Sequence, residues 1–158
     1  MKKLLSLGLV VLFVGIATMT LSGSQDRDVN ERLRDQFVGA WRLVWLEEPD
    51  ADGKINKADC TGLLVYTREG HMSVQVMYRS PQAGSGAAPV QYAQGGYEAS
   101  FGTYEINDAH TFTFHVEGAL VRTLIGKDLK RVYELSGKQL IVKSPDPNEH
   151  WRVAWERY

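Results

Sequence analysis

The chain has 158 residues, a length that suits one domain. Its 18 Lys and Arg nearly balance 19 Asp and Glu, which argues against nucleic-acid binding, because that function needs a basic patch. The single cysteine, Cys60, excludes an internal disulfide, and a core of this size can be stable without one.

The first 24 residues have the pattern of a secretory signal peptide. Lys2 and Lys3 form a positive start, an almost wholly apolar run follows from Leu4 to Thr20, and Ser22 and Ser24 are small. We therefore expect cleavage after Ser24 and a periplasmic or secreted protein. The mature chain then has 16 basic and 19 acidic residues, because only two Lys and no acids are removed.

Two alternatives to cleavage concern the same segment. The apolar run of 17 residues is near the lower limit for a spanning helix, so an uncleaved membrane anchor stays open. Leu21-Ser22-Gly23 resembles the start of a bacterial lipobox, but Ser24 stands where a Cys would carry the lipid. We therefore do not expect lipidation at this point.

After the signal peptide at 1–24, we expect a linker or short helix at 25–36 and one β domain at 37–158. From Phe37 onward, short runs of alternating apolar residues are separated by Gly, Asp and Asn, which is typical of an antiparallel barrel or sandwich. No run alternates with a long helix, so a parallel α/β sheet is not expected. The eight expected strands are residues 41–48, 62–67, 71–78, 101–106, 111–117, 129–135, 139–142 and 151–157.

The connection at residues 79–100 is 22 residues long and rich in Gly, Ala, Gln, Ser and Pro. A connection of this length inside a domain is usually functional or disordered. A lid over the barrel and a loose surface loop both fit this composition. Tyr92, Tyr97 and Phe101 favour at least partial docking, because exposed aromatic rings are costly.

Motifs spread through the whole domain carry a family resemblance. They are, in chain order, Gly39-Ala40-Trp41, Gly70-His71-Met72-Ser73, Phe101-Gly102-Thr103-Tyr104, His115-Val116-Glu117-Gly118, Arg131-Val132-Tyr133 and Trp155-Glu156-Arg157. In this order they resemble the bacterial and fungal lipocalin-like domain family over about residues 36–157. The resemblance implies an all-β, calycin-type antiparallel barrel of about eight strands.

For the bottom of the barrel, the resemblance implies roles for three residues. In lipocalins a Gly-x-Trp motif opens the first strand, the Trp closes the barrel bottom, and an Arg near the end of the last strand lies across its ring. Gly39, Trp41 and Arg157 match these positions. The contact would combine stacking with a cation–π interaction of about 0.5–2 kcal/mol.

Each strand offers two faces, and the choice between them decides where a site lies. In the simpler assignment, the apolar stripes that contain Val74 and Phe114 face inward, because apolar stripes normally point at the core. The polar residues that would then face outward are Ser73, Gln75, His115 and Glu117.

The other assignment reverses the strands at 71–78 and 111–117 and builds a polar site inside. The expected ligand-binding residues are then Ser73, Gln75, Tyr104, His115, Glu117, Arg131 and Tyr133. A few convergent polar groups in an apolar pocket are typical of small-molecule sites. An inward Arg131 needs a carboxylate or an acidic ligand, and Glu117 is its expected partner. His115 beside Glu117 would also allow acid–base chemistry, so these two are the candidate catalytic residues.

We expect no cofactor and no metal, because the four histidines show no clustered ligand spacing. Those histidines are His71, His110, His115 and His150. Cys60 has no Cys–His motif around it, so a structural thiol is favoured over a nucleophile.

The four tryptophans lie on the first and last expected strands. Trp41 and Trp45, like Trp151 and Trp155, are separated by an even number of residues, so each pair is expected to share a face. First and last strands are neighbours in a closed barrel, which predicts one cluster of indoles. A sealing role in the core is favoured over a ligand platform, because large aromatic residues dominate small cores.

The sequence thus predicts an exported carrier or sequestering protein for a small hydrophobic or amphipathic molecule. A barrel enzyme, such as an isomerase or cyclase that uses His115 and Glu117, is the rival hypothesis. A structural envelope module with a filled barrel is the third. A cavity smaller than about 300 Å³ would favour this last hypothesis.

Overall fold

The computed structural model describes the backbone of residues 21–50, 52–80 and 96–158, with side chains from residue 29 onward within these ranges. Helix α1 (Leu21–Phe37) comes first, and a short 3₁₀ helix, η1 (Arg122–Leu124), follows the sixth strand. The strands are β1 (Gly39–Pro49), β2 (Ile55–Lys57), β3 (Cys60–Tyr66), β4 (His71–Tyr78), β5 (Tyr97–Ile106), β6 (Thr111–Ala119), β7 (Asp128–Ser136), β8 (Gln139–Lys143) and β9 (Arg152–Arg157).

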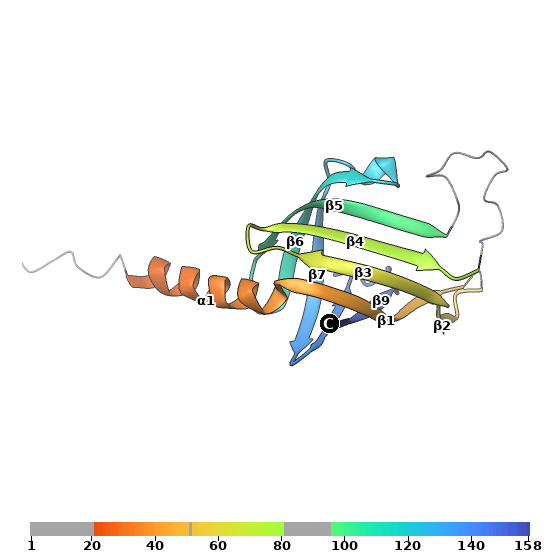
Figure 1. The fold of residues 1–158 in the computed structure, drawn as a ribbon, viewed down its shortest axis with the longest axis horizontal. Helices are drawn as coiled ribbons and strands as arrows, with labels where there is room; N and C mark the ends of the chain where they lie inside the picture. Colours follow the sequence, from red (N-terminus) through yellow and green to blue (C-terminus); the bar gives the residue numbers. More distant parts are fainter. Residues whose placement is uncertain (1–20, 51, 81–95) are drawn as a thin grey trace, which may run out of the picture.

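Eight of these strands form one closed antiparallel barrel. β1 and β3 to β9 pair in chain order, and β9 returns to pair with β1. Figure 1 shows the barrel with α1 leading away from one end, while β1 and β4 end and β5 begins at the other. The predicted all-β barrel of about eight strands is confirmed. β2, which extends the sheet by pairing with the end of β1, was not predicted from the sequence.

The apolar stripes of the strands face into the barrel. On β6, Phe112, Phe114 and Val116 are almost completely buried, whereas the intervening Thr113 and His115 are partly exposed. Their register with β5 and β7 carries this alternation around the sheet. The simpler of the two face assignments is therefore the one that the chain adopts, because it removes aromatic and β-branched surface from water.

A β-bulge in β1 separates Trp45 from the other tryptophans. The register with β9 shifts between Leu43 and Trp45. One extra residue in a strand turns the following side chains to the opposite face. Trp45 therefore lies on the outer face, where Lys57 and Arg152 approach its ring at 5.8 and 5.6 Å from the centroid. The expectation that Trp41 and Trp45 share a face is wrong for this reason.

The end of the barrel next to α1 is filled with aromatic rings. Phe37, the last residue of α1, is completely buried. Its ring centroid lies 5.1 Å from that of Tyr66, 6.3 Å from Tyr104, 5.7 Å from Phe112 and 4.8 Å from Tyr133. Three of these contacts are edge-to-face, an arrangement that is favourable for aromatic pairs. Phe37 thus joins the helix to the floor of the barrel.

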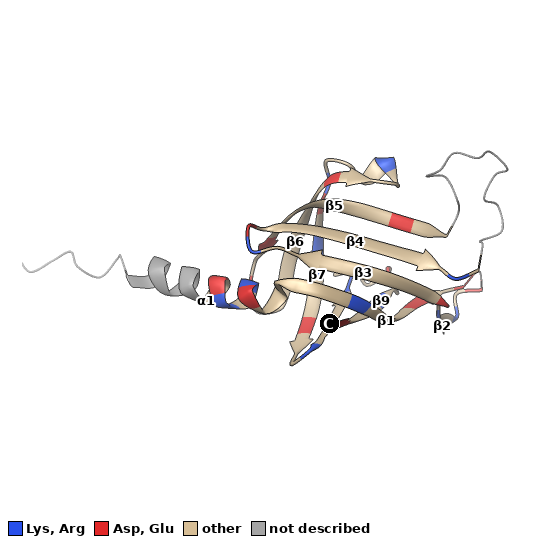
Figure 2. Ribbon diagram, in the orientation of Figure 1, with Lys and Arg blue, Asp and Glu red and all other residues tan. Residues whose placement is uncertain are grey.

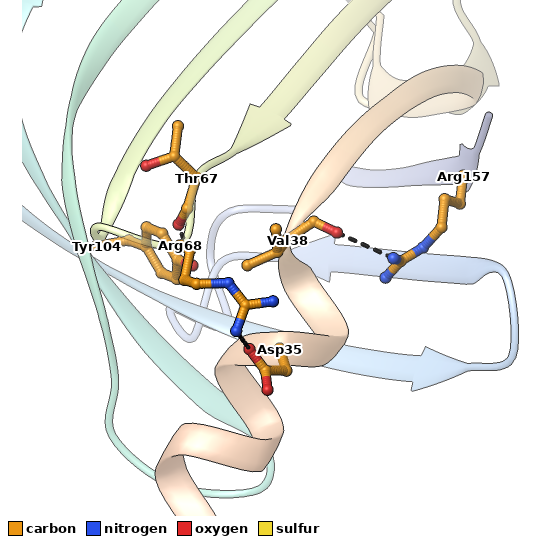
Figure 3. Close-up of polar contacts among 6 residues, drawn as sticks. All are labelled: Asp35, Val38, Thr67, Arg68, Tyr104 and Arg157. Carbon is orange, nitrogen blue, oxygen red and sulfur yellow. Dashed lines mark hydrogen bonds and ion pairs between the residues drawn. The ribbon is translucent and has the colours of Figure 1, made fainter.

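Polar contacts hold the helix and the last strand to the same end, as Figure 3 shows. The Arg157 guanidinium lies 4.5 Å from the centroid of the Trp41 ring. Its Nη1 donates to the carbonyl of Val38 at 2.9 Å (Figure 3). Its Nη2 donates to the carbonyl of Gln36. Asp35 on α1 forms an ion pair with Arg68 in the β3–β4 turn, with 3.0 Å between Oδ1 and Nη1.

Charged residues gather at the turns, at the strand ends and on α1. Figure 2 shows both signs side by side on the described part of α1, and tan ribbon over most of the strands. The charged residues on this part of the helix are Glu31, Arg32, Arg34 and Asp35. Among the described residues, no helix combines the length and the apolarity needed to cross a membrane.

Two sequence predictions fall largely outside the described residues. The predicted signal peptide at 1–24 overlaps the described chain at its last four residues alone, which form the start of α1. Of the long connection at 79–100, residues 81–95 lie outside the description, and Tyr92 is among them. At its end, β5 begins at Tyr97, and Phe101 on this strand is 56% exposed. Tyr97 is 42% exposed, so both rings are partly covered.

Truncating Phe37 should destabilise the barrel strongly. Phe37→Ala removes a fully buried ring from the aromatic floor, so we expect the free energy of unfolding to fall by about 3–5 kcal/mol. Equilibrium urea unfolding measures this change. Phe101→Ala is the matched control, because the same side chain is lost from an exposed position. An equal loss in both variants would show that Phe37 does not join the helix to the barrel.

Candidate ligand-binding site

The barrel encloses a cavity with a volume of about 540 Å³. The lining is mainly apolar and comes from nearly every strand of the barrel. The apolar and aromatic lining residues include Leu46, Leu64, Tyr66, Met72, Val74, Val76, Phe112, Phe114, Leu129, Val142, Trp151, Val153 and Trp155. Aliphatic side chains such as Val74, Val76 and Val142 contribute to this lining beside the larger rings.

The cavity has a closed floor and an open mouth. Tyr66 and Phe112 line it and also belong to the aromatic floor beneath Phe37. Pro49 and Glu98 line it as well, and both are exposed. They lie where β1 ends and β5 begins, at the end of the barrel away from α1 in Figure 1. The cavity therefore reaches the surface at this end.

Arg131 is the cation of the cavity lining. It lies on β7 between Leu129 and Tyr133, which share its inward face. Burial is the main reason that the pKa of Arg131 is lowered, while the charges of Glu149 and Glu98 act in the opposite direction. An arginine nevertheless stays protonated at neutral pH. A positive charge therefore faces a mostly apolar space.

The side chain of Arg131 is held from one side by an indole ring. The guanidinium carbon lies 5.1 Å from the centroid of the Trp151 ring. The Trp151 indole N–H donates to Oε2 of Glu149 at 3.2 Å. Hydrogen bonds from Ser144 and then Trp151 are the largest causes of the lowered pKa of Glu149. The segment before β9 thus forms a wall that positions Arg131.

A second polar group lies near the mouth. The Tyr78 hydroxyl donates to the Glu48 carboxylate, and both side chains line the cavity. Burial is the largest cause of the raised pKa of Tyr78, followed by the hydrogen bond to Glu48 and its charge. Cys60 lies opposite Tyr78 in the β3–β4 ladder, and burial raises the pKa of its thiol. A raised pKa lowers the thiolate fraction and supports the structural role expected for Cys60.

The predicted ligand-binding residues do not converge in the cavity. Of the seven, Arg131 lines it. Tyr104 and Tyr133 are buried in the floor, where their hydroxyls donate at 3.0 Å to the carbonyls of Thr67 and Asp108. Ser73 and Gln75 line a shallow hollow on the outer face of β4 and β5 instead.

His115 and Glu117 lie on the outer face of β6. His115 Nδ1 is 2.7 Å from Oδ1 of Asp128, not beside Glu117. Glu117 is exposed, and the expected ion pair between it and Arg131 is absent. This placement corrects the prediction of an internal acid–base pair. The prediction assigned the wrong face of β6 to the interior. Phe112 and Phe114 face inward instead and are buried.

Two residues that line the cavity, Glu48 and Tyr78, and one that contacts its lining, Glu149, were not predicted from the sequence. Glu48 and Tyr78 sit at strand ends, where alternation is hard to extend past a bulge or a turn. Glu149 lies in a turn that breaks the alternating pattern before β9. The available signal was the run Glu149-His150-Trp151, an acid two residues from an aromatic at the start of a strand. Such a run is too common to single out a site.

A closed eight-stranded antiparallel barrel around an apolar cavity places the chain in the calycin-like class of architectures. A family model described as a lipocalin-like domain matches residues 38–157, so the chain belongs to the lipocalin-like domain family. The predicted resemblance is confirmed. No curated protein matches the sequence. Among solved structures, it is similar to an uncharacterized protein from Bacteroides eggerthii, with 15% identity, a TM-score of 0.46, and coverage of 77% of this chain and 99% of that chain.

Four tyrosines, three buried and one half-buried, predict a loss of stability at alkaline pH. They are Tyr66, Tyr78, Tyr104 and Tyr133, and burial raises the pKa of each, that of Tyr104 to about 12. The folded state then holds more protons than the unfolded chain above the ordinary pKa of 10.0. The stabilisation is fully present below that pH, and the free energy of unfolding should fall as the pH rises above it.

Urea unfolding between pH 8 and 12 measures this dependence, and tyrosinate absorbance follows the titration directly. The folded protein should ionise these phenols at higher pH than the protein in urea. Tyr104→Phe should show a shallower fall of stability with pH. Coincident titration curves for the folded and the unfolded protein would contradict the prediction.

Proposed function

We propose that this protein binds a small, mainly apolar molecule in the barrel cavity, as an exported carrier or sequestering protein. The observation that supports it most is the cavity itself, with about 540 Å³ enclosed by apolar side chains and open at one end. Small-molecule sites typically occupy about 300–1,000 Å³ and are lined in this way. A filled structural barrel would not leave such a space.

The arrangement of the two ends also favours a carrier. The aromatic floor around Phe37 is packed and tied to α1, so one end of the barrel is rigid. The other end opens beside exposed residues, which gives a ligand a path to the cavity. The barrel-enzyme hypothesis loses its named acid–base pair, since His115 and Glu117 lie outside the cavity.

Export rests on the first 24 residues. The charged start, the apolar run and the small residues that follow it are those of a cleavable signal. Cleavage after Ser24 would remove the first four residues of α1 and leave the part that ends in Phe37. The mature chain would then enter the periplasm or the medium with its barrel complete.

Filling the cavity should abolish ligand binding without disturbing the outer surface. Val74 faces the cavity, and its neighbour Gln75 faces outward on the same strand. We expect native mass spectrometry of the protein from its host's envelope to detect a bound small molecule. Val74→Trp should lose this mass because the indole occupies the space, whereas Gln75→Trp, the matched control, should retain it.

A clean apo mass for the unmodified protein, reproduced after incubation with host lipid and metabolite extract, would contradict the proposal. Equal retention of the molecule in both variants would place it elsewhere on the protein. Thermal unfolding of both variants shows whether Val74→Trp still folds.

Processing of the N-terminus gives a separate test of export. We expect the mature protein in the periplasmic or extracellular fraction with Gln25 as its first residue. Intact mass measurement of fractionated cells checks this directly. Replacing Leu9 and Val10 with Asp should keep the chain in the cytoplasm at full length, because the apolar run no longer partitions into the membrane. A full-length chain in the membrane would instead indicate an uncleaved anchor.

A further inference from the structure

The charge on Arg131 is unpaired by any protein carboxylate among the described residues. No carboxylate oxygen of the described chain lies within ion-pair distance of its guanidinium. Within the described residues, Arg131 donates one hydrogen bond, from Nη1 to the carbonyl of Lys130 at 3.1 Å. A guanidinium carries five N–H donors in a planar fork. Most of these donors therefore have no partner within the described part of the chain.

The guanidinium carbon of Arg131 lies over the ring of Trp151, 5.1 Å from its centroid, and this contact restricts where the guanidinium can lie. The Glu149 carboxylate accepts from the indole N–H and so helps to hold the ring in place. Glu149 acts on Arg131 through Trp151 as well as through its charge. A planar, preoriented fork is suited to a carboxylate, which accepts two parallel hydrogen bonds.

The floor adds a neighbouring hydroxyl. Tyr66 lines the cavity and lies close enough to Arg131 for the positive charge to oppose the rise in the tyrosine pKa. Tyr104 and Tyr133 donate to main-chain carbonyls, whereas no partner is found for the Tyr66 hydroxyl among the described residues. Arg131 and Tyr66 are thus two donors on the lining of one cavity.

The charges around the cavity limit the class of anion. Arg131 is the one cation among the described lining residues, and Glu48 and Glu98 are the two acids. A monoanion can be neutralised by Arg131 alone. A dianion such as a phosphate monoester would retain one charge in an apolar space beside two carboxylates, which is unfavourable.

We propose that the cavity is specific for a monocarboxylic acid with an apolar body, and that Arg131 binds its carboxylate. This inference rests on the proposed function and names the ligand class. The apolar body would lie against the Val74 and Phe114 stripes, and the carboxylate would lie against the fork of Arg131. Trp151 and Glu149 are positioning residues, because they act on the ligand through Arg131.

Binding of three matched probes tests the inference. Dodecanoic acid, dodecan-1-ol and dodecyl phosphate share one apolar chain and differ in the head group. Titration of the full mature protein at pH 8, followed by tryptophan fluorescence, to which Trp151 and Trp155 on the cavity lining contribute, gives each affinity. We expect the acid to bind about tenfold to a hundredfold more tightly than the alcohol, and the phosphate to bind more weakly than the acid.

Arg131→Met should remove the preference for the acid and leave the affinity for the alcohol unchanged or higher. Lys130→Met is the matched control, because the neighbouring cation on the same strand is exposed outside the cavity. Trp151→Phe keeps an aromatic face but removes the hydrogen bond to Glu149, so it should reduce the ratio of acid to alcohol affinity. Arg131→Lys, which keeps the charge and loses the fork, should give an intermediate ratio and serves if Arg131→Met does not fold.

The outcomes separate this inference from the proposed function. Equal affinity of the unmodified protein for acid and alcohol, or tighter binding of the phosphate, overturns the inference and leaves the cavity as a binding site. An acid preference that survives in Arg131→Met overturns the role of Arg131. Failure of the alcohol and the acid alike to bind counts against the proposed function itself.

Discussion

The pairing of β1 with β9 closes the sheet, and the contact between Arg157 and Trp41 lies at one end of this ladder. Arg157 is the last residue of β9, and Trp41 lies opposite it in β1. The guanidinium stacks on the indole and donates to carbonyls at the junction of α1 and β1, so three segments meet in one residue. Gly39 permits this approach with a φ of 136°, a conformation that side chains rarely adopt. Without closure, β1 and β9 would both present unpaired edges.

The two ends of the barrel differ, because the end next to α1 is filled with aromatic rings and the cavity extends toward the other end. Phe37 fits among four aromatic rings at the floor, where the phenols of Tyr104 and Tyr133 bond to carbonyls of neighbouring turns. Toward the mouth the inward positions are occupied by smaller side chains such as Val74 and Val76. The circumference of an eight-stranded barrel is fixed by its strand number, so smaller side chains leave unfilled volume. The cavity is thus a consequence of where the large residues lie along the strands.

Much of the fold was predictable because alternation and turn residues are local signals. The hairpin of β3 and β4 follows from Glu69-Gly70 between two alternating runs, and β8 follows from Ser136-Gly137. The bulge in β1 was not predictable, since nothing around Val44 marks an extra residue. That one residue moves Trp45 to the outer face, where only the register with β9 reveals its position.

The candidate site was less predictable because it depends on which face of each strand points into the barrel. Arg131 could be placed inside, since it shares a stripe with Leu129 and Tyr133. On β6, two aromatic rings lie on the inward face, and His115 and Glu117 lie on the other. Because the sequence shows both stripes, it does not decide which of them faces inward until the packing is known. The contact between Arg131 and Trp151 joins residues from β7 and from the turn before β9, and no local pattern encodes it.

Stability alone does not account for an arginine in this cavity. Charge removed from water without an ion-pair partner is costly, and an apolar residue at the position of Arg131 would pack against Leu129 at no such cost. The indole of Trp151 over the guanidinium, together with its bond to Glu149, offsets part of that cost and restricts where the charge can lie. The folding of an empty barrel does not require this arrangement before β9, whereas the proposed binding of an anionic group would use it.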